Sequence, residues 1–285
     1  MISTITRFAP SPTGRLHLGH AYSVMLAHDF ARARGGQFLL RIEDIDPGRC
    51  REAFVEGICE DLRWLGLNWD GEIVRQSERM PVYAGALDRL REMGLLYPCF
   101  CTRRDIAASA SAPHGPEGAV YPGTCRSLSP EERAERAATD PHCWRIDMAE
   151  AARRAGPLSW HDARAGEIAA DPARHGDVVL ARKDAPVAYH LAVTVDDAAQ
   201  GITDVVRGED LFAATHVHRL LQALLGLPTP AYHHHPLLRD DNGRRLAKRD
   251  GAPTLAELRS QGNDAADLLA GWRAKSMVGI TPDNA

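Results

Sequence analysis

The chain opens with a strand, a tight turn, a helix and a second strand, and this order constrains the fold more than any other feature. Residues 2–8 (ISTITRF) are rich in residues that favour strands. The run Pro10–Gly14 predicts a tight turn, and the apolar spacing over 18–33 predicts a helix that Gly35-Gly36 ends. Residues 37–42 predict a short buried strand. This order is the beginning of a doubly wound, nucleotide-binding α/β sheet.

The middle of the chain has a different character. Residues 51–66 and 81–94 predict amphipathic helices of the same α/β fold. Residues 99–175 then hold two close cysteines, a loop rich in Pro, Gly, Ser and Ala over 109–123, and a helical segment over 129–139 that is rich in Ala, Arg and Glu. We interpret 99–175 as an insertion, and the helix over 129–139 as a solvated surface.

Strand-like segments return after the insertion, at 177–181 and 188–195. Another strand ends in Val205–Asp210, and 213–225 predicts a helix. The predicted organisation is therefore a catalytic core whose first half is 1–98 and whose second half is 176–245, interrupted by the insertion at 99–175 and followed by a loop and tail at 246–285.

Composition and charge narrow the class of protein. A formal net charge of −4 argues against unspecific nucleic-acid binding, although not against a local basic patch. No apolar run approaches the ~18 residues of a membrane span, and the N-terminus lacks the pattern of a signal peptide. We expect a cytoplasmic protein with reduced thiols and no membrane partner.

Two histidines begin the first predicted helix, in the sequence His17-Leu18-Gly19-His20. A helix N-terminus offers backbone N–H groups and a positive dipole end to phosphate. Gly19 allows a ligand to approach the backbone closely, and both imidazoles can donate to phosphate oxygens. The alternative is a helix cap with two incidental histidines. The Pro10–Gly14 turn and the strand–helix–strand context favour phosphate binding.

A cluster of charges follows the second predicted strand, in the stretch Arg41–Arg49 (RIEDIDPGR). Ligands bind at the carboxyl ends of strands in open α/β sheets. The alternative is a solvated loop. That alternative is weak for Glu43, because a carboxylate one step past a buried strand is costly unless it meets a cation.

A dense basic stretch lies near the C-terminus, within Arg239–Ala252. Asp241-Asn242-Gly243 predicts a turn, and basic residues follow it. An exposed charged loop is the alternative to a loop that clamps polyphosphate. Only three of the 34 basic residues are lysines, so Lys248 suggests a task that Arg cannot perform.

Three thiols and a phenol, from Cys99, Cys101, Tyr121 and Cys125, could complete a tetrahedral zinc site. The Cys-x-Cys spacing is atypical, so a cluster of reduced cysteines is the alternative. The remaining cysteines, Cys50, Cys59 and Cys143, are expected in helices or in the core as small apolar residues.

These motifs, in this order, resemble those of the class I glutamyl-tRNA synthetases. His17–His20 is similar to the family's "HIGH" signature, and Arg245–Arg249 (RLAKR) to its "KMSKS" signature, with Ala in place of the first Ser. Arg41–Arg49 looks like the glutamate enzymes' own "RIEDTD…R" stretch. The resemblance continues through Tyr189–Asp197 and Val206–Asp210, so it covers nearly the whole chain.

The resemblance implies a Rossmann-type catalytic core that activates L-glutamate with ATP to form glutamyl-adenylate, with Mg2+ accompanying ATP. It assigns roles to four sets of residues. The residues expected to hold glutamate are Arg7, Phe8, Ala9, Pro10, Ser11, Glu43, Tyr189 and Arg207. Those expected to hold ATP are His17, Gly19, His20 and Lys248, and catalysis is assigned to Lys248, His17 and His20. The "HIGH"-like signature comprises Pro10, His17, Leu18, Gly19 and His20, and the "KMSKS"-like signature comprises Arg245, Leu246, Ala247, Lys248 and Arg249.

The chain ends soon after Lys248, where glutamyl-tRNA synthetases continue into an anticodon-binding domain. In this it resembles the glutamyl-queuosine tRNA(Asp) synthetases. They activate glutamate without tRNA and attach it to the queuosine base of tRNA(Asp). Their Cys-x-Cys…Tyr-x3-Cys pattern implies one structural Zn2+ in the insertion. We therefore expect ATP, L-glutamate and queuosine-bearing tRNA(Asp) as partners of a monomer with a short C-terminal tail and no anticodon-binding domain.

One position departs from the glutamate enzymes and one stretch has no assigned role. Val193 stands where glutamyl-tRNA synthetases usually carry Asn, which removes a polar contact near the substrate. For His233-His234-His235 we favour a structural role or one at the edge of the ATP site over a metal tract.

Three other functions remain open from the sequence. The first is a truncated glutamyl-tRNA synthetase that charges a tRNA 3′ end. The second is a nucleotidylyltransferase, which shares the His-x-Gly-His pattern but needs neither Arg41–Arg49 nor the basic stretch. The third is a non-catalytic nucleic-acid-binding paralogue, against which Lys248 and both histidines argue.

Overall fold

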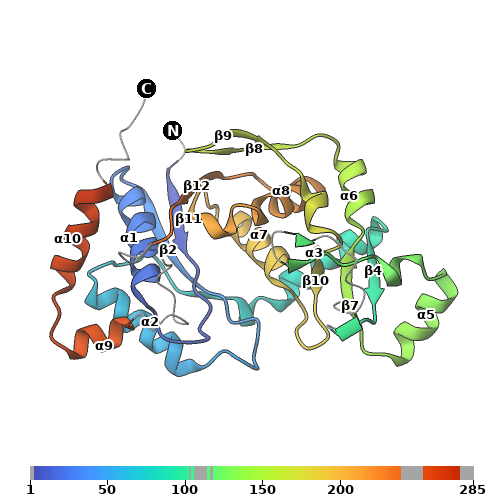
Figure 1. Ribbon diagram of the computed structural model, residues 1–285, viewed down its shortest axis with the longest axis horizontal. Coiled ribbons are helices and arrows are strands. Elements are labelled where there is room, and N and C mark those ends of the chain that lie inside the picture. Colours follow the sequence, from blue (N-terminus) through green and yellow to red (C-terminus); the bar gives the residue numbers. More distant parts are fainter. Residues whose placement is uncertain (1–2, 103, 106–113, 116–117, 239–252, 277–285) are drawn as a thin grey trace. The chain divides into compact units, whose positions relative to one another are not determined.

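The computed structural model describes residues 3–102, 104–105, 114–115, 118–238 and 253–276 (Figure 1). The chain divides into two compact units. The first unit comprises Met1–Arg75, Thr203–Asp210 and His233–Ala285; the second comprises Gln76–Ile202 and Leu211–Tyr232. These units are defined by compactness, whereas the segments predicted from the sequence were defined by function. The boundaries of the predicted segments therefore stay predictions.

A parallel sheet forms the centre of the first unit. β1 (Ile5–Phe8) pairs with β2 (Gln37–Ile42), and β2 pairs with β3 (Val74–Arg75), both in parallel. The connecting helix α1 (Leu18–Arg32) contacts both β1 and β2. The predicted strand–turn–helix–strand opening is therefore confirmed. Because the strands are parallel, the segments that follow β1 and β2 lie at the same edge of the sheet.

Apolar side chains from two helices pack on this sheet. The second helix, α2 (Glu52–Trp64), coincides closely with the predicted amphipathic segment. Side chains from α1, β2 and α2 form one buried core, which includes Ala21, Val24, Met25, Phe38, Leu40, Ile42, Val55, Ile58 and Leu62.

The later parts of the chain complete the first unit. β11 (Asp204–Gly208) is tied to β1, since the backbone N of Thr203 donates to the Ile5 carbonyl at 3.0 Å. The terminal helices α9 (Leu255–Ser260) and α10 (Ala265–Ser276) contact α2 and α1 respectively. In Figure 1 these helices, drawn in red, accordingly flank the blue N-terminal helices.

The second unit combines an antiparallel sheet with a group of helices. Its three-stranded sheet has the order β10-β7-β4, and a β8–β9 hairpin lies apart from it. The strands are β4 (Leu96–Cys99), β7 (Cys143–Ile146), β8 (Ser159–Asp162), β9 (Gly166–Ala169) and β10 (Val179–Ala181), with a short hairpin of β5 (His114–Gly115) and β6 (Gly118–Ala119). The helices are α3 (Met80–Glu92), α5 (Pro130–Thr139), α6 (Met148–Ala155), α7 (Tyr189–Ala199) and α8 (Ala214–Leu225), with the 3-10 turns η1 (Gln76–Glu78), η2 (Thr124–Ser127) and η3 (Pro172–His175). A last turn, η4 (Glu209–Leu211), and strand β12 (Ala231–His235) each contain a boundary between the units.

The prediction of a strand over 188–195 is wrong, because Ala188 caps helix α7 and the residues after it belong to that helix, Tyr189–Ala199. Every residue from 190 to 197 is buried. A helix that is buried all round carries no apolar stripe with a period of 3.6 residues, and its β-branched Val and Thr residues favour a strand locally. Tertiary contacts overrode that preference. The Asp196 carboxylate, for example, accepts hydrogen bonds from Gln76 and Tyr83 at 2.8 and 2.7 Å.

The other predicted helices agree with the structure. α3 and α8 cover the segments predicted at 81–94 and 213–225, and α5 has no buried residue, as expected of a solvated helix. Among the described residues, no helix combines the length and the apolar character that a membrane span requires.

Candidate functional site

The turn after β1 is fixed against the segment after β2. The backbone N of Glu43 donates to the Pro10 carbonyl at 3.0 Å, and that of Arg51 donates to the Pro12 carbonyl at 3.1 Å. Pro10 and Pro12 are buried, whereas Ser11 between them is exposed. The turn Pro10–Gly14 and the charged stretch Arg41–Arg49 therefore meet at the carboxyl edge of the parallel sheet.

Glu43 is a buried carboxylate at this edge. Its side chain is 8% exposed, and its Oε1 lies 3.9 Å from a guanidinium nitrogen of Arg41, which is fully buried. Glu43 thus meets the cation that a buried carboxylate requires, namely the guanidinium of Arg41 two positions earlier. A carboxylate held in this way can also accept a hydrogen bond from a ligand ammonium group.

Two further arginines of the first unit are buried on neighbouring strands. Arg7 lies on β1 and Arg207 on β11, and each is 5% exposed. The backbone N of Thr203 donates to the Ile5 carbonyl, the backbone N of Ile5 donates to the Thr203 hydroxyl, and these bonds hold the two strands beside each other. A guanidinium can bind a carboxylate through two parallel hydrogen bonds, so this pair of strands provides the chemistry for an acidic side chain.

The histidine triplet contacts three different partners. His233 lies 2.8 Å from an Asp204 carboxylate oxygen. His234 accepts a hydrogen bond from Nε of Arg207 at 3.1 Å, and His235 lies 3.0 Å from the Ser23 hydroxyl. The separate partners support the structural interpretation over a metal tract. The sequence flagged this triplet but gave no sign that its middle member contacts a predicted substrate residue.

The two histidines of the first motif cap helix α1 with their own rings. His17 accepts from the backbone N of Gly19 through Nδ1 at 3.1 Å, and His20 accepts from the backbone N of His17 through Nδ1 at 3.3 Å. The ring centroids lie 3.9 Å apart, and the ring planes are tilted by 36°. In a neutral imidazole whose Nδ1 accepts, the proton is on Nε2, so each ring is a donor at its outer nitrogen. The first turn of α1 holds no acidic residue that would offset its positive end.

The predicted residues of the basic stretch, Arg245, Leu246, Ala247, Lys248 and Arg249, lie outside the described residues. The chain directly after them is described. Thr254 forms a backbone bridge with His17, and the backbone N of Leu255 donates to the Leu16 carbonyl at 2.9 Å. The segment that follows the basic stretch is therefore held beside the histidine motif.

Tyr189 belongs to the second unit, where it is the first residue of helix α7. Its half-buried ring lies 5.5 Å from that of His190 and 5.6 Å from that of His218, measured between centroids. Val193 is four residues further along the same helix, hence on the same face, and is 2% exposed. Val193 thus places an apolar side chain on the same face of α7 as Tyr189, at the position where the resembling enzymes usually place an amide.

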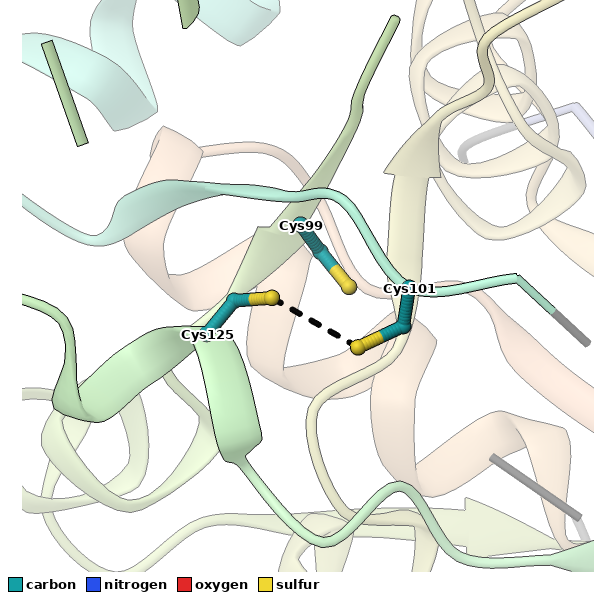
Figure 2. Close-up of side chains that lie close together, drawn as sticks. All are labelled: Cys99, Cys101 and Cys125. Atoms are coloured by element: carbon teal, nitrogen blue, oxygen red, sulfur yellow. Dashed lines mark hydrogen bonds between the residues drawn. The ribbon is translucent and has the colours of Figure 1, made fainter. Parts of the chain in front are cut away.

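The predicted metal ligands come together at the end of β4. Figure 2 shows the thiols of Cys99, Cys101 and Cys125 pointing toward one another, and all three sulfurs lie within 4.8 Å. The Cys101 sulfur is 3.5 Å from that of Cys125 and 3.7 Å from the Tyr121 hydroxyl. A zinc ion with Zn–S bonds of ~2.3 Å requires sulfurs about 3.8 Å apart. This donor set therefore fits a tetrahedral soft-metal site.

The thiols of the cluster differ in how readily they ionise. A hydrogen bond from Cys143 is the main cause that lowers the pKa of Cys99 to about 4. Burial raises the pKa of Cys101 to about 11, and burial also raises the pKa of the Tyr121 phenol. The Arg145 guanidinium lies 4.0 Å from the centre of the Tyr121 ring. A bound cation would deprotonate the remaining ligands, because it favours their charged forms.

Cys143 has a more specific position than the sequence suggested. It pairs with Cys99 across the antiparallel strands β4 and β7, and its thiol lies 3.5 Å from the Cys99 carbonyl. It is buried, as expected of an apolar cysteine, and it also contacts a predicted metal ligand. Of the other two cysteines, Cys59 is buried in α2, as expected, whereas Cys50 is half-buried in the loop before that helix.

Residues 3–282 match the family model described as the catalytic domain of class I tRNA synthetases (E and Q). A glutamyl-Q tRNA(Asp) synthetase of Rhodobacter capsulatus is 52% identical over 274 residues, which cover 93% of this chain and 98% of the relative. A glutamyl-Q tRNA(Asp) synthetase of Rhodopirellula baltica is 42% identical, and the match covers 100% of this chain and 88% of that one.

A solved structure is similar over most of the chain. It is a glutamate tRNA ligase of Elizabethkingia meningosepticum in complex with its amino acid, with a TM-score of 0.74 and 30% identity. The match covers 88% of this chain and 53% of that ligase, so the present chain spans about half of the ligase's length.

Proposed function

Because the chain belongs to the glutamyl-Q tRNA(Asp) synthetases, and so to the class I tRNA synthetases for glutamate and glutamine, we propose that it activates L-glutamate with ATP and transfers the glutamate to the queuosine base of tRNA(Asp). It is a ligase-type enzyme. The observation that carries the proposal is the match to the Rhodobacter capsulatus relative, which is nearly complete in both chains. A cytoplasmic location and a monomeric state belong to the same proposal.

Glutamate is held by charges of opposite sign to its own. Arg7 and Arg207 bind the side-chain carboxylate, since both are buried arginines on adjacent strands. Glu43 binds the α-ammonium group, and Ser11, in the turn after β1, also contacts the glutamate. Phe8, Ala9 and Pro10, at the end of β1 and directly after it, belong to the same set of glutamate-binding residues, as does Tyr189. Val193 offers no polar contact, so glutamate affinity is lower than an Asn there would give.

ATP lies at the positive end of α1. The outer nitrogens of His17 and His20 donate to its phosphates, and Gly19 allows the close approach. Mg2+ bound with ATP would offset phosphate charge. Lys248, flanked by Arg245 and Arg249, stabilises the charge that develops on the phosphates in the transition state. The backbone bridge between Thr254 and His17 supports this role, because it brings the chain after Lys248 to the histidines.

The reaction has two steps and needs no protein nucleophile. A glutamate α-carboxylate oxygen attacks the α-phosphorus of ATP, the bond to the bridging oxygen breaks, and glutamyl-adenylate and pyrophosphate form. A hydroxyl of the acceptor nucleoside then attacks the activated carbonyl, an ester forms, and AMP leaves. The enzyme contributes alignment and positive charge, which are effective when they are arranged before the reaction.

Cys99, Cys101, Tyr121 and Cys125 bind one structural Zn2+ in the insertion. The mutual distances of the three sulfurs and the Tyr121 hydroxyl support this assignment. The ion would fix the end of β4 to η2, two segments that are joined by a long stretch of chain.

Two assays test the proposed function. Glutamate-dependent exchange of pyrophosphate into ATP, measured without tRNA over all amino acids, should be specific for glutamate. Its absence would refute the activation step and would leave a nucleotidylyltransferase or a non-catalytic paralogue.

The second assay identifies the acceptor. Radiolabelled glutamate should be transferred to tRNA(Asp) that carries queuosine. It should not be transferred to the same tRNA made without queuosine, or to tRNA(Glu). Transfer to tRNA(Glu) at its 3′ end would show instead a truncated glutamyl-tRNA synthetase.

A further inference from the structure

A buried carboxylate in α2 makes contacts that neither the glutamate nor the ATP residues explain. Asp61 is fully buried. Its Oδ1 accepts from a guanidinium nitrogen of Arg259 in α9 at 3.1 Å, whereas its Oδ2 has no hydrogen-bond partner among the described residues. Asp61 and Arg259 are far apart in sequence, so their contact joins two distant segments of the first unit.

A second arginine approaches the same helix from the first motif. Gly57 lies one turn before Asp61 in α2. The guanidinium of Arg15 rests against this glycine so closely that an added Cβ would lie 2.3 Å from its NH1 nitrogen. The positive charges of Arg259 and Arg15 both act on the Asp61 carboxylate.

These contacts complete a ring of connections around the histidine motif. Arg15 directly precedes Leu16, whose carbonyl accepts from the backbone N of Leu255 at 2.9 Å. His17 and Thr254 form the next backbone bridge. Thr254 also caps α9. Asp61 therefore acts on both sides of the bridge, through its hydrogen bond with Arg259 on one side and through the positive charge of Arg15 on the other.

Stability alone does not account for a charge at this position. Burial raises the pKa of Asp61 to about 6, although two arginines favour its ionised form. The cost of desolvating the carboxylate thus exceeds what its partners return. A neutral side chain of the same shape would be cheaper to bury.

We propose that Asp61 is a positioning residue, which uses Arg259 and Arg15 to hold the chain after the basic stretch against the His17 motif, so that the groups that meet ATP are aligned before ATP binds. This inference rests on the proposed ATP-dependent activation. It assigns Asp61 no contact with a substrate. Its effect on the reaction passes through the backbone bridge between His17 and Thr254.

The first test replaces the charge and keeps the shape. Asp61→Asn should lower kcat/KM for ATP by roughly 10-fold in glutamate-dependent pyrophosphate exchange, the scale of a small misalignment of reacting groups. KM for glutamate should stay within about twofold, because the glutamate residues lie at the edge of β1 and β2, and the melting temperature should not fall. Arg259→Gln should cause a similar loss, and the double variant should be no worse than the more impaired single one.

Glu60→Gln is the matched control. Glu60 binds the other guanidinium nitrogen of Arg259 at 3.1 Å, but its side chain is 56% exposed. An exposed ion pair contributes little, so this variant should retain wild-type kinetics. If Glu60→Gln and Asp61→Asn were equally impaired, the role assigned to the buried carboxylate would be wrong.

A second pair of variants tests the contribution of Arg15 without changing Asp61. Gly57→Ala forces the Arg15 guanidinium to move, while Ala favours the helix. It should reduce kcat/KM for ATP with no loss of melting temperature. Gly85→Ala in α3 is its control, since an added Cβ there would meet nothing within 4 Å.

The outcomes separate the inference from the proposed function. Wild-type protein without glutamate-dependent exchange would overturn both. An active wild type whose Asp61→Asn and Gly57→Ala variants keep their kcat/KM for ATP would overturn the role of Asp61 alone. That role would also be overturned if the variants lost melting temperature and both substrates' kinetics together, which indicates general structural damage.

Discussion

Nε of Arg207 donates a hydrogen bond to Nε2 of His234 at 3.1 Å, and both side chains are buried. The acceptor nitrogen carries no proton, so His234 is a neutral imidazole with its proton on Nδ1. The bond occupies one edge of the guanidinium and fixes its plane. Arg207 is thereby oriented before any substrate arrives, which reduces the entropy that glutamate binding must overcome.

His234→Leu should therefore weaken glutamate binding. The loss of the acceptor leaves a buried guanidinium N–H unsatisfied, at a cost of about 1–3 kcal/mol. We expect KM for glutamate in pyrophosphate exchange to rise about 10-fold or more, with KM for ATP nearly unchanged. His233→Leu is the control, since His233 contacts Asp204 instead. Equal effects of the two variants on glutamate would show that His234 has no special role.

Arg7→Ala should abolish glutamate activation while ATP still binds. The substitution removes the positive charge that pairs with the substrate's side-chain carboxylate, and the His17 motif on the following helix is unaffected. Calorimetric titration with ATP and the exchange assay measure the two properties separately. Arg7→Lys should restore little, because an ammonium group cannot form the paired hydrogen bonds of a guanidinium. Normal glutamate affinity in Arg7→Ala would contradict the assignment.

Lys248→Ala should slow glutamate-dependent exchange by ~10²-fold or more, the scale of one lost electrostatic donor. A contact made mainly in the transition state lowers the rate and leaves the Michaelis constants almost unchanged. Lys248→Arg should recover part of the loss, because a planar guanidinium follows a moving phosphate oxygen less well than an ammonium does. A raised KM for ATP with an unchanged turnover rate would make Lys248 a ground-state phosphate binder.

Purified protein that has not met a chelator should contain about one zinc per chain by elemental analysis. Cys101→Ser should reduce the zinc content and lower the melting temperature, since the ion links β4 to η2. Cys59→Ser is the control, because Cys59 is a buried thiol in α2 of the other unit. It should lower the melting temperature without loss of zinc. A zinc-free wild type would refute the site.

Asp61 should make stability depend on pH in a defined direction. Its pKa of about 6 in the folded protein lies above the ordinary value of 3.8, so folding favours the protonated form. Its contribution to stability is therefore largest in acid and is lost as the pH rises from about 4 to 6, by up to roughly 3 kcal/mol. Asp61→Asn removes this term. Denaturant unfolding measures the free energy of unfolding of both proteins. The variant minus wild-type difference in this free energy should be more positive at pH 7.5 than at pH 5. A difference that does not change with pH would contradict the prediction.

Local patterns in the sequence determined the opening of the fold and nominated the candidate site residues. The strand at 37–42 and the helix over 18–33 could be predicted because the apolar residues of each segment follow a pattern typical of that structure. The structure places β2 and α1 there. The cysteine cluster was predictable because thiolates are suitable zinc ligands and must lie close together to share one ion, and Cys99, Cys101 and Cys125 do come together. The proposed glutamate-binding and catalytic residues rest on motif resemblance, which is also a local property of the sequence.

Contacts between distant segments were decided only by the tertiary structure. Helix α7 was predicted as a strand because burial on all sides erases the helical period. The Arg207–His234 bond, the pairing of Cys143 with Cys99 and the contact of Asp61 with Arg259 each join residues whose local sequence shows no relation. Such contacts arise from the packing of whole elements, because a buried polar group takes whichever partner the assembled core brings within reach.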